Sequence, residues 1–269
     1  MIEIKNITKQ FGKLKALDTV SANFTEGQAI SLIGPNGSGK TTLIKCLLGM
    51  VIPDAGTIHF KGSDVTTSCD YRRDMGYMPQ IGRYPDNMRI SQIFDMMIDL
   101  RKNYTTQLDE ELINAFDLRK QFDKPMRTLS GGTIQKVSAC LAFLFDPSVL
   151  ILDEPTASLD PVASEVLKNK VLKEKNKGKL ILMTSHILSD LEEMTTDIVY
   201  LQDGKLQFFK SVEALKAATN EQRLAKAIAS VMSKGIQVQM NGMNGNGHTP
   251  PSPKEFSRTV NRREMTIKI

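Results

Sequence analysis

The most constraining feature of this sequence is a glycine-rich loop that follows a short apolar run. Residues 34–41 read GPNGSGKT and fit the phosphate-loop pattern GxxxxGK[ST]. Ala29–Ile33 before the loop is apolar, as in a buried strand, and apolar residues at helical spacing follow it as far as Gly49. Such a loop surrounds phosphate groups with amide N–H groups, and the next helix presents its positive end to the anion. The pattern predicts a nucleotide site.

Two side chains of this loop have specific chemistry. We expect Lys40 to reach the β- and γ-phosphates of the nucleotide and the Thr41 hydroxyl to bind Mg²⁺. A glycine-rich turn without a ligand is the alternative, but a strand before the loop and a helix after it are the context of a phosphate loop. The residues predicted to bind ATP are Gly34, Pro35, Asn36, Gly37, Ser38, Gly39, Lys40, Thr41 and Thr42.

Apolar runs alternate with helical patterns along the rest of the chain. Val149–Leu152 and Leu180–Met183 are continuous apolar runs of the kind that form buried parallel strands. Residues 90–126 are helical in pattern, whereas residues 1–33 and 56–80 are typical of short strands and turns. Strands that alternate with helices predict an α/β fold with a parallel sheet.

Two acids end the apolar run Val149–Leu152. Because a parallel strand presents its C-terminal end to the ligand crevice, we expect Asp153 near the Mg²⁺ ion and Glu154 beside the attacking water. An apolar run followed by Asp-Glu is by itself a common strand end. Its position, 113 residues after Lys40 and behind a complete phosphate loop, favours the functional interpretation.

A second glycine-containing stretch begins at Ser130, 23 residues before Asp153. Ser130 can cap a helix, and the two glycines after it leave the first amide groups of that helix bare, which makes a second anion site. One nucleotide does not need two such sites from one subunit. A head-to-tail dimer, in which each second site closes on the partner's nucleotide, is the economical arrangement, and a capped helix start without a ligand is the alternative.

These motifs, in this order, resemble the ATP-binding cassette (ABC) family of ATPases over about residues 1–215. The resemblance implies a P-loop NTPase with a RecA-like parallel-sheet core, an antiparallel β subdomain and an α-helical subdomain at about residues 81–146. It implies ATP hydrolysis with Mg²⁺, in which Glu154, Lys40 and the switch histidine His186 are catalytic. The other residues it implies are Phe11, stacked on adenine; Thr41, Gln80 and Asp153 at Mg²⁺; and Asp160 of the D-loop. It also implies that Ser130, Gly131 and Gly132 are the signature residues, which begin the signature helix and act on the partner's nucleotide.

Two stretches, residues 78–85 and 129–145, resemble more narrowly the ATPase subunit of the ABC transporter that serves nitrous-oxide reductase maturation. In that system a cytosolic ATPase dimer drives a membrane subunit and supports the assembly of a copper enzyme. Cassettes of multidrug and lipid exporters share much of the pattern, so an exporter ATPase is an alternative. A soluble ABC ATPase that acts on a non-membrane partner, such as an iron–sulfur assembly scaffold, is another.

Composition limits the expected partners. No apolar run approaches the roughly 18 to 20 residues of a membrane span, so the resemblance implies a separate permease that holds this chain at the cytoplasmic face of the inner membrane. Residues 1–219 contain 27 Lys/Arg and 27 Asp/Glu, and this neutral body gives no reason to expect nucleic acid. Three widely spaced cysteines fit a reducing cytosol.

The character of the chain changes after the cassette, which we assign to residues 1–219. Residues 220–240 have apolar side chains on one helical face and predict a C-terminal helix. Residues 241–254 are rich in Asn, Gly and Pro, which is typical of a flexible linker. Residues 255–269 are a basic tail, which could contact anionic lipid or remain disordered.

Overall fold

The computed structural model of the protein describes residues 1–102, 107–185 and 192–234. The phosphate loop, the signature residues and the two acids after the apolar run all lie within these ranges. His186, the linker at 241–254, the basic tail at 255–269 and the end of the predicted helix at 220–240 lie outside the described residues.

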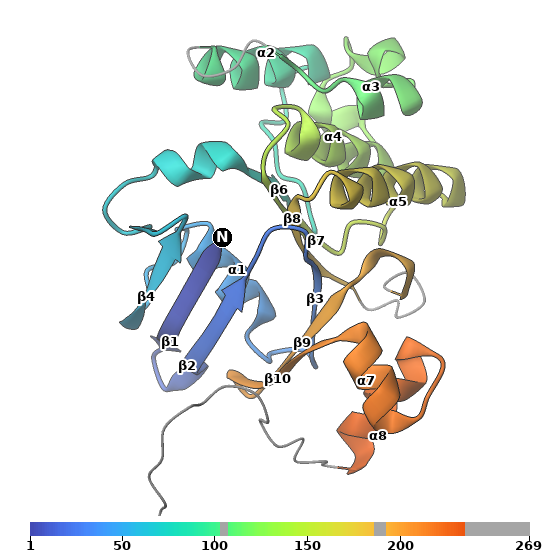
Figure 1. Ribbon diagram of the computed structural model, residues 1–269. Helices are drawn as coiled ribbons and strands as arrows, with labels where there is room; N and C mark the ends of the chain where they lie inside the picture. The colour runs from blue at the N-terminus through green and yellow to red at the C-terminus, as the bar shows by residue number, and fades with distance from the viewer. Residues whose placement is uncertain (103–106, 186–191, 235–269) are drawn as a thin grey trace, which may run out of the picture. The chain divides into compact units, whose positions relative to one another are not determined.

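A six-stranded sheet has the order β10-β9-β3-β8-β7-β6 (Figure 1). Its strands are parallel except for β10, which is antiparallel to β9. The three predicted buried strands and the α/β fold class are confirmed. The strands are β3 (Ala29–Ile33), β6 (Met75–Met78), β7 (Val149–Asp153), β8 (Leu180–Thr184), β9 (Asp197–Gln202) and β10 (Lys205–Ser211).

The central strands β3, β7 and β8 are buried throughout because both faces of the sheet are covered. Successive side chains of a strand point to opposite faces. Ile151 and Leu182 therefore belong to one core, together with helix α1 (Lys40–Leu47). Leu152 and Ile181 belong to a second core, on the face covered by two longer helices. These helices are α4 (Gly131–Phe143) and α5 (Pro161–Asn176).

A second, antiparallel sheet of four strands has the order β2-β1-β4-β5. Its strands β1, β2 and β4 are labelled in Figure 1, and the sheet shares the core around α1. Short strands were expected at the start of the chain, but the first two strands are long. They form a hairpin whose turn contains Gly12, with φ of 57°, a conformation that glycine adopts without strain. The strands are β1 (Ile2–Phe11), β2 (Leu14–Phe24), β4 (Ala55–Phe60) and β5 (Ser63–Asp64).

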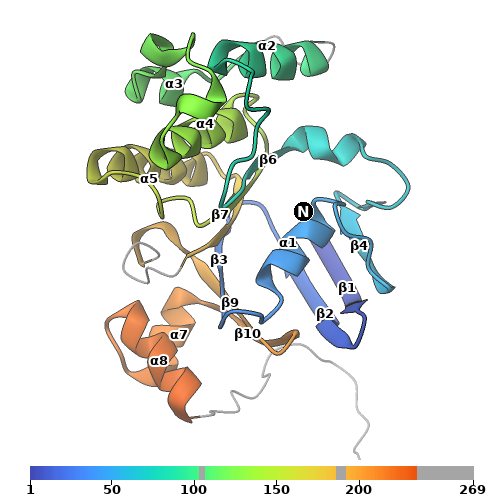
Figure 2. The ribbon, with the colours of Figure 1, turned by 180° about the vertical axis from the view of Figure 1, so that it is seen from behind.

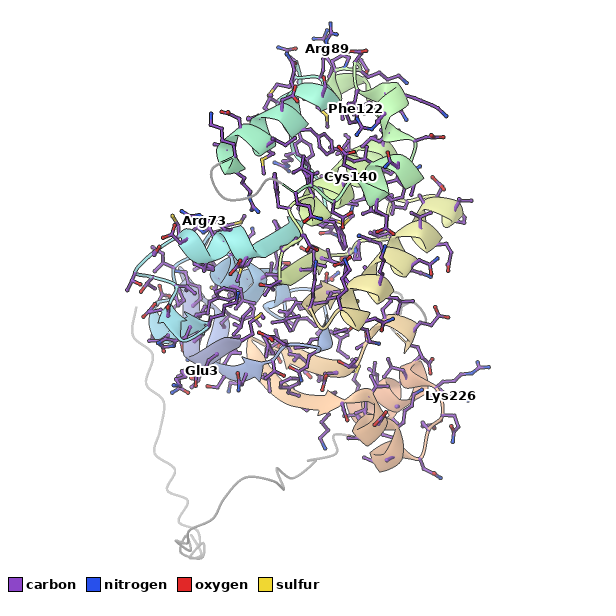
Figure 3. All side chains as sticks on the ribbon, turned by 45° about the horizontal axis from the view of Figure 1, so that its top comes forward. Glu3, Arg73, Arg89, Phe122, Cys140 and Lys226 are labelled. Atoms are coloured by element: carbon purple, nitrogen blue, oxygen red, sulfur yellow. The ribbon has the colours of Figure 1, made fainter. Side chains whose placement is uncertain are left out.

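The helical prediction for residues 90–126 is correct only in part (Figure 2). Asp117 has a left-handed φ of 52°, which interrupts the helix, and Pro125 has no N–H group for a helical bond. Phe122, which is labelled in Figure 3, packs within this small region. Its ring stacks on that of Phe94 with the centroids 5.5 Å apart. Its elements are α2 (Ile90–Arg101), α3 (Glu111–Ala115), η2 (Leu118–Gln121) and η3 (Met126–Thr128).

Three further differences from the sequence prediction lie outside this region. Within residues 56–80, the segment before β6 is a 3₁₀ helix, η1 (Asp70–Asp74), instead of a strand. The C-terminal helix α8 (Leu224–Lys234) starts after residue 220 because Asn220 has a left-handed φ of 54° and ends the preceding helix. That preceding helix, α7 (Val212–Thr219), was not predicted.

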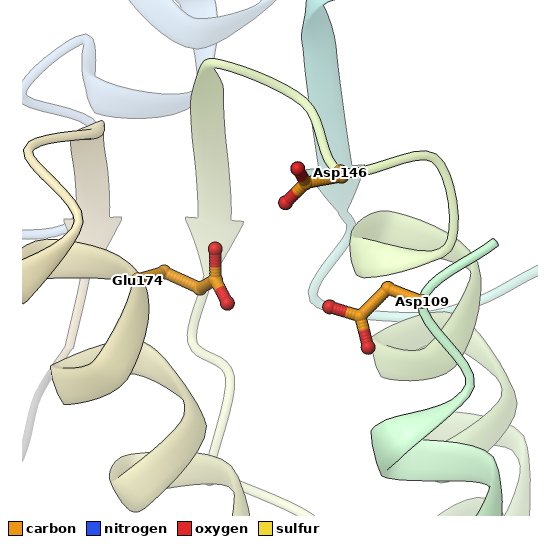
Figure 4. A group of neighbouring side chains, drawn as sticks. All are labelled: Asp109, Asp146 and Glu174. Atoms are coloured by element: carbon orange, nitrogen blue, oxygen red, sulfur yellow. The ribbon is translucent and has the colours of Figure 1, made fainter. Parts of the chain in front are cut away.

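A charge network ties α5 to the segments before α3 and after α4. The carboxylates of Asp109, Asp146 and Glu174 lie within 4.8 Å of one another (Figure 4). They are not free to bind a cation, because lysines already lie among them. Lys170, which is 2% exposed, is 2.5 Å from Asp109 and 2.9 Å from Glu174. Lys179 is 2.5 Å from both Glu174 and Asp146.

The pKa of Glu174 follows from the same contacts. Burial of this carboxyl raises its pKa, but hydrogen bonds from Lys177, Lys179 and Lys170 outweigh burial and lower the pKa to about 2. Glu174 is therefore charged at neutral pH although its side chain is fully buried. A buried charge of this kind depends on its partners, so the network holds α5 in place only while it is complete.

Candidate functional site

The phosphate loop lies between β3 and α1, and backbone contacts dictate two of its glycines. Gly34 has φ of 149°, and a Cβ atom there would lie 2.1 Å from the carbonyl oxygen of Leu201. Gly39 has φ of 103°, and its Cβ atom would lie 2.4 Å from the carbonyl oxygen of Ala16. Residues with a side chain rarely adopt these φ values, and the contacts are too short for a methyl group. Both positions therefore require glycine.

The start of α1 offers bare donors to an anion. Gly39 is the N-cap residue, and no side chain caps the first amide groups of the helix. Lys40 Nζ donates hydrogen bonds to the carbonyl oxygens of Gly34 (2.7 Å) and Pro35 (3.0 Å). The ammonium group is therefore held against the loop, on the side where phosphate groups bind in a loop of this kind.

The burial of polar groups at the loop also points to a ligand there. Burial lowers the pKa of Lys40, while the charges of Glu154 and Asp153 raise it and so oppose that effect. Ser38 Oγ is buried and has no hydrogen-bond partner among the described residues. A buried hydroxyl without a partner is costly. A ligand with phosphate oxygens would satisfy it.

A cavity of about 380 Å³ brings most of the predicted site residues together. It opens over the phosphate loop and reaches β1 on one side and the end of β7 on the other. Gly34 and Pro35, which were also predicted to bind ATP, do not line it. The residues that do are Phe11, Leu14, Ala16, Asn36, Gly37, Ser38, Gly39, Lys40, Thr41, Thr42, Gln80, Asp153 and Glu154.

The two acids occupy this cavity for reasons of strand geometry. Asp153 ends β7 and is opposite Thr184 of the neighbouring parallel strand β8. Its carboxylate accepts a hydrogen bond from the Thr184 hydroxyl at 2.5 Å and is only 6% exposed. Glu154 has a left-handed φ of 50°, which turns the chain at the end of the strand.

Phe11 lies at the open side of the cavity. Its ring is 49% exposed, and Lys9 Nζ lies 5.4 Å from the ring centroid. An exposed aromatic ring at the mouth of a phosphate site offers a stacking surface for a flat base. Two other residues that line the cavity, Leu14 and Ala16 on β2, were not predicted, because nothing in their local sequence marks a ligand contact.

The signature residues do not line the cavity of their own chain. Ser130 caps α4, and its hydroxyl accepts a hydrogen bond from the Thr133 amide at 3.3 Å. Gly131 and Gly132 follow it in the first turn of that helix. Asp160 caps α5 and pairs with Lys136 of α4 at 2.8 Å, so the signature helix and the D-loop are linked.

The chain matches the model of a known protein family. The family model described as "ABC transporter" matches residues 17–157, more than half of the chain. The chain belongs to the ABC transporter family. The matched range contains the phosphate loop, the signature residues and the two acids that end β7. As an ABC ATPase, the protein hydrolyses ATP in a reaction coupled to transport.

Relatives with curated names are ATP-binding proteins of transporters. The chain is 32% identical over 212 residues to the lantibiotic transport ATP-binding protein SrtF of Streptococcus pyogenes, covering 77% of this chain and 89% of that protein. It is 30% identical over 209 residues to the Nod factor export ATP-binding protein I of Ralstonia nicotianae, covering 76% of this chain and 65% of that protein. These names support an ATP-binding subunit of an ABC transporter.

Solved structures of ABC cassettes share the fold. The ATP-binding subunit of an ABC transporter superposes with a TM-score of 0.79 at 25% identity, covering 86% of this chain and 99% of that one. A dimeric cassette in a post-hydrolysis state, bound to ADP and phosphate, superposes with a TM-score of 0.69 at 23% identity, covering 78% and 98%. In the part of this ABC ATPase that the structure describes, no helix is long and apolar enough to cross a membrane.

Proposed function

We propose that this ABC ATPase works as a head-to-tail homodimer with Mg²⁺ and drives a separate membrane permease. The observation that carries the proposal is the division of the site. The cavity unites the phosphate loop with Asp153 and Glu154, but Ser130 and the signature helix lie outside it. A second copy that faces the first would add its signature helix, with bare amide groups, to the open side of the nucleotide.

The phosphate loop binds the nucleotide in this proposal. The amide groups of residues 36–41 and the buried Ser38 hydroxyl donate hydrogen bonds to the phosphate chain. Lys40, which lies against the loop, moves its ammonium group from the Gly34 and Pro35 carbonyls to the β- and γ-phosphates. Phe11 stacks on the adenine ring at the mouth of the cavity.

The residues beside the loop fit Mg²⁺. Thr41, Gln80 and Asp153 line the same cavity and offer hydroxyl, amide and carboxylate oxygens, the hard ligands that this ion prefers. A Mg²⁺ ion held by these residues would supply positive charge against the phosphate chain. Asp153 is only 6% exposed, and the hydrogen bond from the Thr184 hydroxyl holds its carboxylate in a fixed orientation.

Glu154 is the proposed general base. It accepts a proton from a water molecule while the water oxygen bonds to the γ-phosphorus, and the bond to the β-phosphate bridging oxygen breaks to leave ADP and phosphate. His186, which lies outside the described residues, is the proposed contact to the γ-phosphate. Asp160, at the cap of α5, would transmit the closure of one site to the other through the D-loop.

The shared site predicts complementation between inactive variants. Lys40→Ala and Ser130→Arg should each be inactive alone. Lys40→Ala lacks a phosphate contact, and the arginine of Ser130→Arg blocks the start of the signature helix. In a mixed dimer one of the two sites combines two intact halves. Random mixing at equal amounts should restore about a quarter of the parent ATPase rate.

The control for this experiment mixes Lys40→Ala with Glu154→Gln. Both lesions fall in the same half of the site, so every site of a mixed dimer keeps one lesion and no activity should return. Cross-linking shows whether Lys40→Ala and Ser130→Arg form mixed dimers. If they do and turnover is never restored, the head-to-tail arrangement is wrong.

The membrane partner is tested by capture. In the proposal the permease docks on the helical region from Ile81 to Met126, where Ile81, Met96 and Leu100 are exposed apolar side chains. Tagged Glu154→Gln protein with ATP should recover a polytopic membrane protein from solubilised native membranes. Leu100→Asp in the same protein should abolish recovery, whereas Met232→Asp, a matched exposed apolar position on α8, should not.

The identity of the captured protein tests the finer function. We infer a role in nitrous-oxide reductase maturation from the sequence stretches 78–85 and 129–145. Recovery of the membrane subunit of that system supports this role. Recovery of an export permease instead favours the drug or lipid exporter, a second candidate supported by the export and lantibiotic-transport names of relatives. Recovery of soluble proteins alone overturns the permease proposal and favours an assembly scaffold as partner.

A further inference from the structure

Thr184 ends β8 and lies opposite Asp153 in the parallel pairing with β7. It is 2% exposed, and none of the sequence motifs includes it. Its hydroxyl oxygen lies between the two acids of the site. It donates a hydrogen bond to Asp153 Oδ1 at 2.5 Å and accepts one from the Glu154 amide at 3.0 Å.

These two hydrogen bonds fix the direction of the hydroxyl proton. A threonine hydroxyl has one proton and accepts through its lone pairs. The Glu154 N–H group can only donate, and the Asp153 carboxylate, when ionised, can only accept. The proton of Thr184 must therefore point to Asp153, and the hydroxyl links the side chain of one acid to the main chain of the other.

Glu154 needs such support because of its backbone conformation. Its φ of 50° is uncommon for a residue with a side chain and is held only where the surroundings favour it. The Glu154 amide points at both the hydroxyl (3.0 Å) and the carbonyl oxygen (3.2 Å) of Thr184. Thr184 therefore accepts both hydrogen bonds of the Glu154 amide and stabilises the turn after β7.

We propose that Thr184 is a positioning residue of the ATPase site. Its hydroxyl sets the orientation of the Asp153 carboxylate and the place of Glu154 before the nucleotide arrives. This inference rests on the roles proposed above for Asp153 at Mg²⁺ and Glu154 at the attacking water. Preorganised groups of this kind avoid reorganisation during the reaction, and loss of a partner that orients a metal ligand typically costs affinity or rate.

The test compares Thr184→Val with Thr184→Ser in the full-length protein. Thr184→Val keeps the size and β-branching of the side chain and removes both hydrogen bonds of the hydroxyl. We expect a 10- to 100-fold fall in kcat, roughly the loss seen when such orienting partners are removed, and a rise in the Mg²⁺ concentration needed for half-maximal rate. Binding of ATP without metal should stay unchanged, because the phosphate loop is untouched. Thr184→Ser, which retains the hydroxyl, should keep most of the activity.

Thr195→Val is the matched control. Thr195 is also buried, at 6% exposure, and its hydroxyl bonds the Ser31 hydroxyl at 2.6 Å, outside the cavity. Its loss removes one buried hydrogen bond and should leave kcat and the Mg²⁺ dependence unchanged. Melting curves of all variants show whether each one is folded, and Thr184→Ala replaces Thr184→Val if the valine variant does not fold.

Two results would overturn the inference. One is parent-like turnover and Mg²⁺ dependence in folded Thr184→Val. The other is an equal loss in Thr184→Ser and Thr184→Val, because serine keeps the hydroxyl and the loss would then not depend on that group. The Glu154→Gln variant separates this from the proposed function: if Glu154→Gln hydrolyses ATP normally, the role of Glu154 itself is wrong, whatever Thr184 does.

Discussion

Replacing Glu154 with glutamine should lower ATP turnover by about 10²- to 10⁴-fold, the usual contribution of a general base. The amide cannot take the proton of the attacking water. Glu154 lies in the same cavity as the phosphate loop but is not part of that loop, so the donors of residues 36–41 remain in place and ATP should still bind. If hydrolysis reopens the proposed dimer, the variant should accumulate as an ATP-bound dimer, seen by size-exclusion chromatography with and without ATP.

The control for this variant is Glu165→Gln, the same chemical change at an exposed position on α5. It should turn over ATP at the parent rate and elute as the parent does. Parent-like turnover in Glu154→Gln would show that another residue serves as the base. Loss of turnover without an ATP-dependent dimer would support the chemistry and contradict the head-to-tail assembly.

Replacing Lys170 with methionine should lower the free energy of unfolding by about 3–5 kcal/mol, as when one partner of a buried ion pair is removed. Lys170 is 2% exposed and contacts Asp109, Glu111 and Glu174. Methionine fills a similar volume but leaves these carboxylates without their shared cation. Urea unfolding followed by circular dichroism measures the change.

Lys173→Met is the matched control for the charge network. Lys173 also pairs with Glu111 at 2.8 Å, but its side chain is 54% exposed. Its loss should cost less than about 1 kcal/mol, the usual limit for an exposed pair. If Lys170→Met is no more destabilising than Lys173→Met, the buried network does not hold α5 as described.

The parts of the site that were predictable from the sequence are those encoded locally. The glycine spacing of residues 34–41 and the apolar run that ends at Asp153 each identify a strand and the ligand group after it. Both lie at one cavity. Local patterns sufficed because the carboxyl ends of parallel strands meet at one edge of a sheet, wherever those strands lie in the chain.

The parts that were missed depend on contacts between distant residues. Thr184 contacts Asp153 across 31 positions of sequence, and Lys170 contacts Asp109 across 61. Nothing near either residue in the sequence marks the contact. The helical prediction for 90–126 went too far because apolar spacing does not reveal a left-handed residue such as Asp117. The signature residues were predicted from a local motif, and in the proposed arrangement they face the nucleotide of another copy.

The contacts of Gly34 and Gly39 have a consequence for how the protein tolerates mutation. The atoms that exclude a side chain are main-chain carbonyl oxygens, of Leu201 in one sheet and Ala16 in the other. Every amino acid has the same main-chain carbonyl group. A substitution at position 16 or 201 therefore makes no room for a side chain at Gly39 or Gly34. The two glycines therefore have no compensating substitution at those partners. An engineer who redesigns this protein can repack the side chains around the loop but must leave the two glycines unchanged.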